Sequence, residues 1–276
     1  MLTGYRFVVA ACLLFQVSQY FSRAYSNPLF YHDDAISAGM ANVHLMSGDA
    51  PFYTNNVAVL GLCEQTDIGI NYENRYAIQD ISTRSIYAGS KLWSLGTGAA
   101  ISQFGNTSFN EVNMILGLGK QVFSNLSIGV TLNYHTQYTR TEAERNNHVN
   151  AKCGAIYFPS NKWRIGALLE NLNINADNIV LKRLACIGTS YTEAFFTLIF
   201  ETQLYKEQVP SFHFGADIEL VENFNVRAGV KRREELEVSF GLGYSYSGIY
   251  ANVAFEHHPY LGYASFVTLN YLFGGR

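Results

Sequence analysis

The chain has 276 residues, of which 48% are hydrophobic, 14% aromatic and only 15% charged. The charged fraction lies well below the roughly 25% that is usual for soluble globular domains. With 19 Tyr, 19 Phe and 23 Gly against 5 Pro, the composition favours a β protein over a helical or disordered one. The formal net charge is -3 at pH 7, which gives nucleic-acid binding no electrostatic basis.

The amino terminus has the features of an export signal. Arg6 supplies a positive charge, residues 7–15 are apolar, and Ser22 and Ala24 are small residues at the positions that a signal peptidase reads. A short membrane anchor is the alternative, but the apolar run is far shorter than the ~20 residues that a spanning helix needs. The pattern therefore predicts a cleaved signal peptide over residues 1–24 and an exported protein.

Residues 25–62 lack a regular period and are interrupted by Asp33, Gly48 and Pro51. Short mixed segments with turn residues are typical of irregular structure with small helical turns. We expect this segment to cap or plug a barrel formed by residues 63–276.

From about residue 65 the chain alternates between apolar and small or polar residues, most clearly over residues 126–134. This period of two predicts β-strands. Most segments are about ten residues long, which matches the roughly 9 to 11 tilted residues that cross a bilayer, whereas strands of soluble sandwiches usually have about five or six. The candidate strands lie near residues 65–75, 81–92, 96–104, 109–120, 125–137, 148–158, 162–171, 181–190, 195–205, 211–220, 224–232, 236–245, 249–257 and 263–273.

The connections between these strands alternate in length. Residues 138–147 form a long charged connection and residues 159–161 a tight one, and the same alternation continues along the chain. Bacterial outer-membrane barrels have short periplasmic turns and longer outer loops. The fold class predicted is all-β, a transmembrane antiparallel β-barrel of about 14 strands (12 to 14) in the outer membrane with an amino-terminal plug; a soluble secreted β protein is the alternative.

Charged residues fall on one face of the predicted strands. In the last six strands they occupy the positions opposite to the apolar ones, as a barrel requires, because a charge facing the bilayer midplane costs up to ~2 to 4 kcal/mol. Such residues either pair across the lumen or form unpaired rings that select ions, and pairing is favoured because both signs occur on adjacent strands. The candidate lumen charges are Lys162, Arg164, Glu170, Glu201, Asp217, Glu219, Arg227, Lys231, Glu237 and Glu256.

The segment before the barrel carries a family resemblance. Residues 35–43 (AISAGMANV) and 49–60 (DAPFYTNNVAVL) resemble the opening of the FadL-like superfamily of outer-membrane barrels. Residues 68–76 continue in a way that is similar to the PorV and PorQ proteins of the type IX secretion system. The resemblance implies a 14-stranded barrel, although Asn56 and Val57 stand where the family usually has Pro-Ala and the chain is short for the family.

Motifs for catalysis or cofactor binding do not stand out. Cys63, Cys153 and Cys186 are an odd number with wide spacing, which favours neither a disulfide framework nor a zinc knuckle. The sequence lacks the common hydrolase, metalloprotease and phosphate-loop signatures. We therefore expect a non-enzymatic protein without a cofactor.

Two minor alternatives stay open at this point. The residues His32, Asp33, Asp34 and His44 could bind a metal, but their spacing matches no defined site. His257 and Ser265 could form a hydrolase pair on the outer wall, while a solvated loop histidine is the simpler reading.

The leading hypothesis for function is a PorV- or PorQ-like accessory barrel that docks secretion-system or surface proteins. Its partner-binding loop would contain Arg140, Glu142, Glu144 and Arg145, because exposed charged loops commonly carry binding sites.

The alternative is a FadL-like conduit in which a hydrophobic ligand occupies the lumen and leaves sideways into the membrane. The candidate plug or gate residues are Gly39, Met40, Tyr53 and Asn55. A co-purifying protein partner would favour the first hypothesis, and a bound lipid the second.

Overall fold

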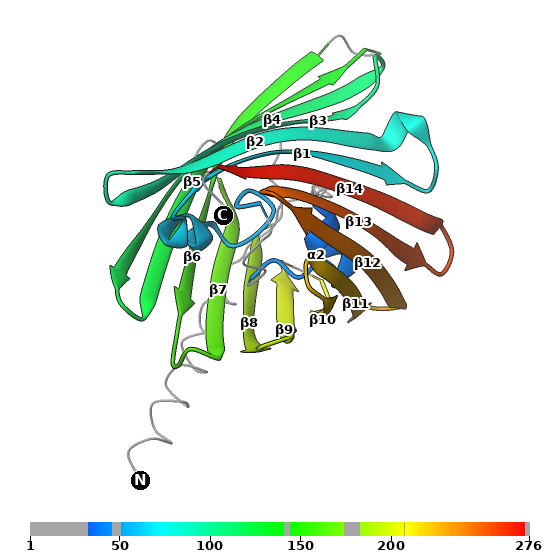
Figure 1. Cartoon of the computed structure of the whole chain (residues 1–276). Helices are drawn as coiled ribbons and strands as arrows, with labels where there is room; N and C mark the ends of the chain where they lie inside the picture. The colour runs from blue at the N-terminus through cyan, green and yellow to red at the C-terminus, as the bar shows by residue number, and fades with distance from the viewer. Residues whose placement is uncertain (1–32, 46–50, 141–143, 174–182, 207, 274–276) are drawn as a thin grey trace.

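A computed structural model of the chain describes residues 33–45, 51–140, 144–173, 183–206 and 208–273. The predicted signal peptide lies outside the described residues. Fourteen antiparallel strands, each paired with its chain neighbours, close into a barrel in which β1 pairs with β14 (Figure 1). The strands are β1 Thr66–Arg75, β2 Ser82–Leu92, β3 Leu95–Gly105, β4 Phe109–Phe123, β5 Leu126–Thr139, β6 Glu144–Tyr157, β7 Trp163–Asn173, β8 Leu184–Glu193, β9 Phe196–Tyr205, β10 Ser211–Val221, β11 Phe224–Arg232, β12 Leu236–Tyr246, β13 Ile249–His258 and β14 Gly262–Phe273. The predicted barrel and its strand count are confirmed.

The barrel wall has an apolar outside and a small or polar inside. On β5, Ile128, Val130 and Leu132 are each about half exposed, whereas Ser127 and Thr131, at alternate positions, are buried. Successive side chains of a strand point to opposite faces, so the period of two in the sequence becomes an apolar outer face and a lumen-facing face.

The two ends of the barrel differ in the length of their connections. At the end that holds the start of β1 and the end of β14, five hairpins turn within two residues, and the sixth spans residues 158–162. In the β12–β13 hairpin Ser247 and Gly248 have φ values of 50° and 82°, the positive values that a two-residue type I′ turn requires. The opposite end has longer connections, such as residues 76–81, which include the 3-10 helix η3 (Gln79–Ile81), and residues 206–210. The predicted asymmetry is therefore present.

One predicted loop is shorter than expected. We expected residues 138–147 to be a long loop, but β5 runs to Thr139 and β6 begins at Glu144. Tyr138 pairs with Arg145, and Thr139 pairs with Glu144. The hydrogen-bonded ladder continues past the apolar part of these strands, so the charged composition there marks strand ends rather than a loop.

The amino-terminal segment lies inside the barrel. The short helix α2 (Ala35–Gly39) packs against β11 to β14, and the 3-10 helix η2 (Val57–Leu62) packs against β2 to β6. Figure 1 shows α2 within the ring of strands. Among the described residues, none of the helices combines the length and apolar character needed to span a bilayer. We use the name plug for residues 33–45 and 51–62.

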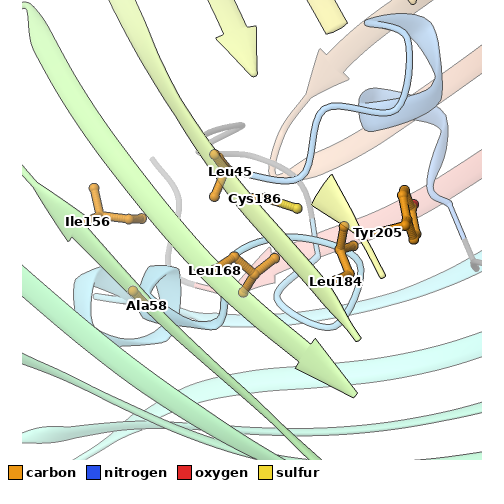
Figure 2. Packing of buried hydrophobic residues seen from close by; sticks show 7 residues of the cluster. All are labelled: Leu45, Ala58, Ile156, Leu168, Leu184, Cys186 and Tyr205. Carbon is orange, nitrogen blue, oxygen red and sulfur yellow. The ribbon is translucent and has the colours of Figure 1, made fainter. Parts of the chain in front are cut away.

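The buried core lies between the plug and the wall. Around η2 and the end of the first plug segment, Leu45 and Ala58 pack against Leu168, Leu184 and Cys186 of the wall (Figure 2). A second cluster places Phe52, Tyr53, Val57 and Leu60 against Tyr87, Ala100 and Ile115. Because the inward faces of the strands find their apolar partners in the plug, plug and barrel form one folded unit.

Candidate functional site

The two parts of the plug are tied together by one carboxylate. Asp34 precedes α2 and accepts hydrogen bonds from the backbone N–H groups of Ile36 (2.8 Å) and Ser37 (3.0 Å). Aspartate is a preferred residue at this capping position because its carboxylate accepts the free N–H groups of the first turn. The Thr54 hydroxyl donates to the same carboxylate at 2.6 Å, so the helix cap also holds the second plug segment.

Polar wall residues bind the plug backbone. The Ala35 N–H donates to Thr268 Oγ1 at 2.9 Å, and the Ala41 N–H donates to Ser239 Oγ at 2.7 Å. The Asn71 side chain donates to the carbonyl oxygen of Asp33 at 2.7 Å. Buried backbone groups of a short, irregular segment need such partners, and the lumen wall supplies them.

Inward glycines let the plug approach the wall. A Cβ atom at Gly98 would lie 2.6 Å from the Phe52 ring, and one at Gly215 would lie 2.7 Å from Met40 Cβ. A Cβ at Gly119 would lie 2.5 Å from the backbone N of Gly61. A side chain at these strand positions would force the plug to shift, so glycine allows the close approach of the Phe52 ring, of Met40 and of the Gly61 backbone.

The four candidate gate residues all lie in the plug. Gly39 lies against Gly241 of β12, where an added Cβ would be 3.1 Å from the Gly241 Cα. Met40, Tyr53 and Asn55 are almost fully buried. The structure thus brings them to the interior of the barrel, between the two ends of the lumen.

Most candidate lumen charges are paired with charges on nearby strands. Arg227 lies 2.8 Å from Asp217, and Lys231 lies 2.5 Å from Glu256 and 3.2 Å from Glu237. The favoured paired arrangement, rather than rings of single charge, is the one found here. The charges of each pair thus compensate one another inside the barrel.

Lys152 joins this paired set and also binds the plug. Its ammonium group lies 2.5 Å from a carboxylate oxygen of Glu170. It also donates to the backbone carbonyl oxygens of Tyr53 and Asn55, both at 3.1 Å. The β6–β7 ion pair therefore holds the segment that contains two of the candidate gate residues.

Three of the candidate charges lie toward the ends of the barrel. Glu219 is exposed at the end of β10, where it accepts the N–H of Asn223 at 3.2 Å, and Lys162 pairs with Glu193 at 2.6 Å in the exposed rim. Expecting these two in the lumen was wrong, because the strands end there and the side chains reach solvent. Arg164 lies at the tight-turn end, with its guanidinium 5.9 Å from the centre of the Phe158 ring.

The sequence analysis missed several lumen residues. Glu73 is buried, contacts Arg75, and alternates with the outward residues Ile70 and Tyr72 of β1. The alternation of charged and apolar residues, used for the last six strands, also assigns Glu73 to the lumen when it is applied to the first strand. Lys152 alternates with Ala and Cys, which mark the outward face too weakly to set the phase.

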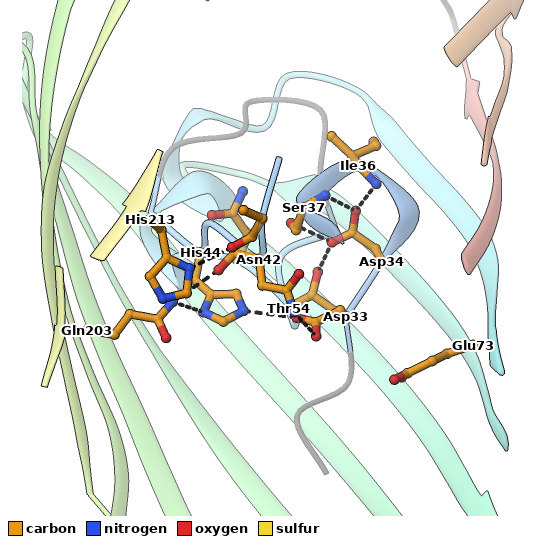
Figure 3. A network of polar contacts seen from close by, with 12 residues as sticks. Asp33, Asp34, Ile36, Ser37, Asn42, His44, Thr54, Glu73, Gln203 and His213 are labelled. Carbon is orange, nitrogen blue, oxygen red and sulfur yellow. Dashed lines mark hydrogen bonds and ion pairs between the residues drawn. The ribbon is translucent and has the colours of Figure 1, made fainter. Parts of the chain in front are cut away.

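A buried polar network connects the plug to β9 (Figure 3). His44 Nε2 lies 3.0 Å from Asp33 Oδ1, and His44 Nδ1 lies 3.1 Å from the Gln203 side-chain nitrogen. Burial favours the neutral forms of His44 and Asp33, but the hydrogen bond and the charge attraction between the two side chains outweigh it. The pKa of His44 is therefore raised and the pKa of Asp33 is lowered. Glu201 accepts the backbone N–H groups of His44 (2.8 Å) and Leu45 (3.0 Å).

The predicted partner loop is only partly a loop. Arg140 is an exposed turn residue after β5, while Glu144 and Arg145 belong to β6. Glu142 lies outside the described residues. The four residues therefore do not form one continuous loop.

The residues of the suggested hydrolase pair make other contacts. The His257 ring packs against the Tyr263 ring with centroids 4.8 Å apart. The Ser265 hydroxyl donates to the carbonyl oxygen of Asn74 at 3.4 Å. Neither contact is the serine–histidine hydrogen bond that activates a nucleophile.

A cavity of about 530 Å³ lies between the plug and the tight-turn end of the barrel. Its lining is mixed, because apolar residues of the plug and the wall share it with polar and charged residues. The apolar residues include Phe52, Leu60, Leu62, Tyr87, Ile156 and Leu272, and the polar ones include Glu64, Gln65, Asp67, Arg164 and Asn270.

Comparison with solved structures finds other barrels with this fold. The P. putida toluene transporter TodX has a TM-score of 0.68 at 9% identity, with 88% of this chain and 99% of that chain covered. The Ralstonia pickettii toluene transporter TbuX has a TM-score of 0.67 at 12% identity, with 88% of this chain and 97% of that chain covered. A Pseudomonas aeruginosa FadL homologue has a TM-score of 0.63 at 10% identity, with 86% of this chain and 98% of that chain covered.

At the sequence level, no family profile and no curated protein matches the chain. At 9 to 12% identity, the structural likeness concerns the fold alone. The chain has the 14-stranded fold of FadL-like outer-membrane barrels.

Proposed function

We propose that this protein is a non-enzymatic outer-membrane transporter for hydrophobic small molecules. The observation that carries the proposal is the cavity of about 530 Å³ between a folded plug and one end of the barrel. Its volume is within the roughly 300 to 1,000 Å³ of typical small-molecule sites, and such sites are lined mainly by apolar and aromatic groups with a few polar ones. Phe52, Leu60 and Tyr87 supply the apolar and aromatic lining here.

The polar part of the lining limits the kind of ligand. Arg164, Asp67 and Asn270 border the same cavity, so one end of a ligand can carry a hydrogen-bonding or charged group. We propose a small hydrophobic or amphipathic molecule, such as an aromatic hydrocarbon or a medium-chain fatty acid. The structural neighbours, which include two toluene transporters, support this class of ligand.

The plug would act as the gate of this transporter. Phe52 and Leu60 border the cavity, and their segment also contains Tyr53 and Asn55. Passage from the long-loop end to the cavity requires this segment to shift, since the plug is packed against the inward glycines of the wall. The division into a cleaved signal peptide (residues 1–24), a plug (25–62) and a barrel (63–276) belongs to this proposal.

The PorV- and PorQ-like hypothesis receives no support from these neighbours, which are transporters. The charged residues assigned to a partner loop also do not form one loop. Docking of secretion-system proteins is therefore not the function that the geometry favours.

The proposal can be tested by filling the cavity from the wall. Gly89 borders the cavity, and a Cβ at this position would meet nothing closer than Leu60 Cδ2 at 3.7 Å. Gly89→Phe should therefore fold but fill the site, while Gly89→Ala is the matched control. The expected result, by native mass spectrometry with added decanoate or toluene, is ligand retention by the wild type and Gly89→Ala, and its loss in Gly89→Phe.

Two outcomes would contradict the proposal. Ligand retention that is equal in all three proteins would place the binding site outside this cavity. A protein partner that stays bound after gentle extraction, together with no retention of decanoate or toluene, would favour the accessory-barrel hypothesis over transport.

A further inference from the structure

Three side chains with metal-binding atoms converge where the plug meets β8 and β9. His44 comes from the plug, Cys186 from β8 and Glu201 from β9, and one donor atom of each lies within 4.8 Å of the other two. The residues are 4%, 4% and 0% exposed. Within the part of the chain that the structure describes, this is the one group of His, Cys and acidic side chains whose donor atoms converge so closely.

The histidine is oriented as metal-bound histidines usually are. Its Nε2 lies 3.0 Å from Asp33 Oδ1, and Nδ1 faces Glu201 Oε1 at 4.0 Å. Ligating histidines almost always donate their second ring N–H to a carboxylate or carbonyl, which fixes the ring and its tautomer. Asp33 therefore occupies the position of the outer carboxylate, and Figure 3 shows it on the far side of the His44 ring from Gln203.

The carboxylate is also held in place. Glu201 Oε2 accepts the N–H groups of His44 and Leu45, and Oε1 accepts the Gln203 side-chain N–H at 2.7 Å. The same Gln203 nitrogen lies 3.1 Å from His44 Nδ1, so an ion bound between Oε1 and Nδ1 would replace the Gln203 amide as the partner of both atoms. Glu201 is fixed by the plug itself, so the ligand set forms only when the plug is seated.

We propose that His44 Nδ1, Cys186 Sγ and Glu201 Oε1 form a binding site for a divalent transition metal, with Zn²⁺ the best match. Nitrogen, thiolate and carboxylate donors are the ligands that zinc uses in proteins. A tetrahedral zinc ion with bonds of about 2.0 to 2.3 Å holds its ligand atoms roughly 3.3 to 3.8 Å apart. Nδ1 and Oε1 are 4.0 Å apart and all three donor atoms lie within 4.8 Å of one another, so the side chains must move together by about 0.5 to 1 Å to hold the ion.

The charges and surroundings are consistent with a divalent ion. A thiolate and a carboxylate neutralise the two positive charges of zinc, which suits an apolar setting where a net charge is costly. Leu45 and Leu184 pack in the same buried cluster as Cys186 (Figure 2). The bound ion would connect the plug to two wall strands and so hold it in the barrel. This inference goes beyond the transport proposal and does not depend on it.

The test uses the full-length barrel purified in detergent, treated with a chelator and titrated with Co²⁺. The wild type should bind cobalt with a thiolate-to-cobalt absorption band in the near ultraviolet, and Zn²⁺ should displace it. Cys186→Ser should lose the band, and Glu201→Gln should weaken cobalt binding. Cys153→Ser, which changes a partly buried cysteine of β6, is the matched control and should behave as the wild type.

A second measurement on the wild type alone guards against a variant that fails to fold. Hydrogen exchange of the plug peptides should slow about tenfold at a zinc concentration ten times the Kd, because a ligand stabilises the state that binds it. Exchange in β12, away from the site, should not change. Three results would each overturn the proposal. They are the absence of a cobalt–thiolate band in the wild type, an equal band in Cys186→Ser, and a rate of plug exchange that does not change when zinc is added.

Discussion

Lys152→Met should loosen the plug while leaving the barrel closed. The Lys152 ammonium group pairs with Glu170 at 2.5 Å and donates to the carbonyl oxygens of Tyr53 and Asn55. Methionine keeps most of the apolar length of the side chain but removes the charge and all three contacts. Glu170, which is 8% exposed, would then be left as a carboxylate without its cation.

The size of the effect follows from the burial of the pair. Removing one partner of a buried ion pair typically costs about 3 to 5 kcal/mol, because the remaining charge is uncompensated. Each 1.4 kcal/mol is a factor of ten in an equilibrium constant. If the loss falls on the seated plug, the population of the open plug rises roughly 100- to 3,000-fold.

Hydrogen exchange with mass spectrometry measures this population directly, because local opening exposes backbone N–H groups. Peptides that cover residues 51–62 should exchange faster in Lys152→Met by the factor given above. Peptides from β12 (Leu236–Tyr246) serve as the internal control and should exchange as in the wild type.

A double variant distinguishes the cost of leaving the Glu170 carboxylate without a cation from a general loss of folding stability. Lys152→Met combined with Glu170→Leu removes both charges, and such replacements are often close to neutral. The plug of the double variant should therefore exchange at least tenfold more slowly than the plug of Lys152→Met. This factor corresponds to about 1.4 kcal/mol in the free energy of plug opening. Plug exchange that is unchanged in Lys152→Met, or equal in the single and double variants, would refute the reasoning.

Three further variants test the contacts of the plug. Gly98→Ala places a methyl group against the Phe52 ring and should destabilise the seated plug by about 1 to 3 kcal/mol. Adding Phe52→Leu should restore part of that loss. If hydrogen exchange of the plug is as fast in the double variant as in Gly98→Ala, the steric explanation is wrong. Ser239→Ala removes the acceptor of the Ala41 N–H and should cost about 1 to 3 kcal/mol because a buried donor loses its partner, measured by exchange at that amide. Thr54→Val removes the hydroxyl that joins the second plug segment to Asp34 and should cost about 1.5 to 3 kcal/mol; a melting curve and plug exchange identical to the wild type would contradict it.

The barrel could be predicted from the sequence because the bilayer imposes a strong pattern. Lipid requires an apolar residue at every second position, and residues 126–134 show this without exception. All fourteen predicted segments are strands. The errors concern strand ends outside the apolar band, such as Glu144 and Arg145, where lipid no longer constrains composition.

The interior was predictable only where charge segregates clearly. Asp217 and Arg227 could be assigned to the lumen because bulky apolar residues mark the outward face of β10 and β11. Lys152 could not, since its neighbours Ala151 and Cys153 are small. Glu219 has the right phase but lies at a strand end, and alternation alone does not show where a strand meets solvent.

The contacts of the plug were beyond sequence reasoning. Residues 33–62 have no period, so the sequence does not indicate which wall strand each residue meets. The role of the inward glycines of β3 and β4 depends on the position of Phe52 and Leu60, which come from a distant part of the chain. The meeting of His44 with Cys186 and Glu201 likewise joins residues separated by more than a hundred positions.

The central claim is that the barrel passes hydrophobic molecules through a cavity beside the plug. Uptake of labelled decanoate by bacterial cells that lack their own transporter, with and without this chain in the outer membrane, tests it most directly. The account predicts faster uptake with the wild type and Gly89→Ala, uptake at the background rate with Gly89→Phe, and no increased entry of a sugar of similar mass. Sugar entry that rises together with decanoate entry, or decanoate uptake that does not exceed the background, would contradict it.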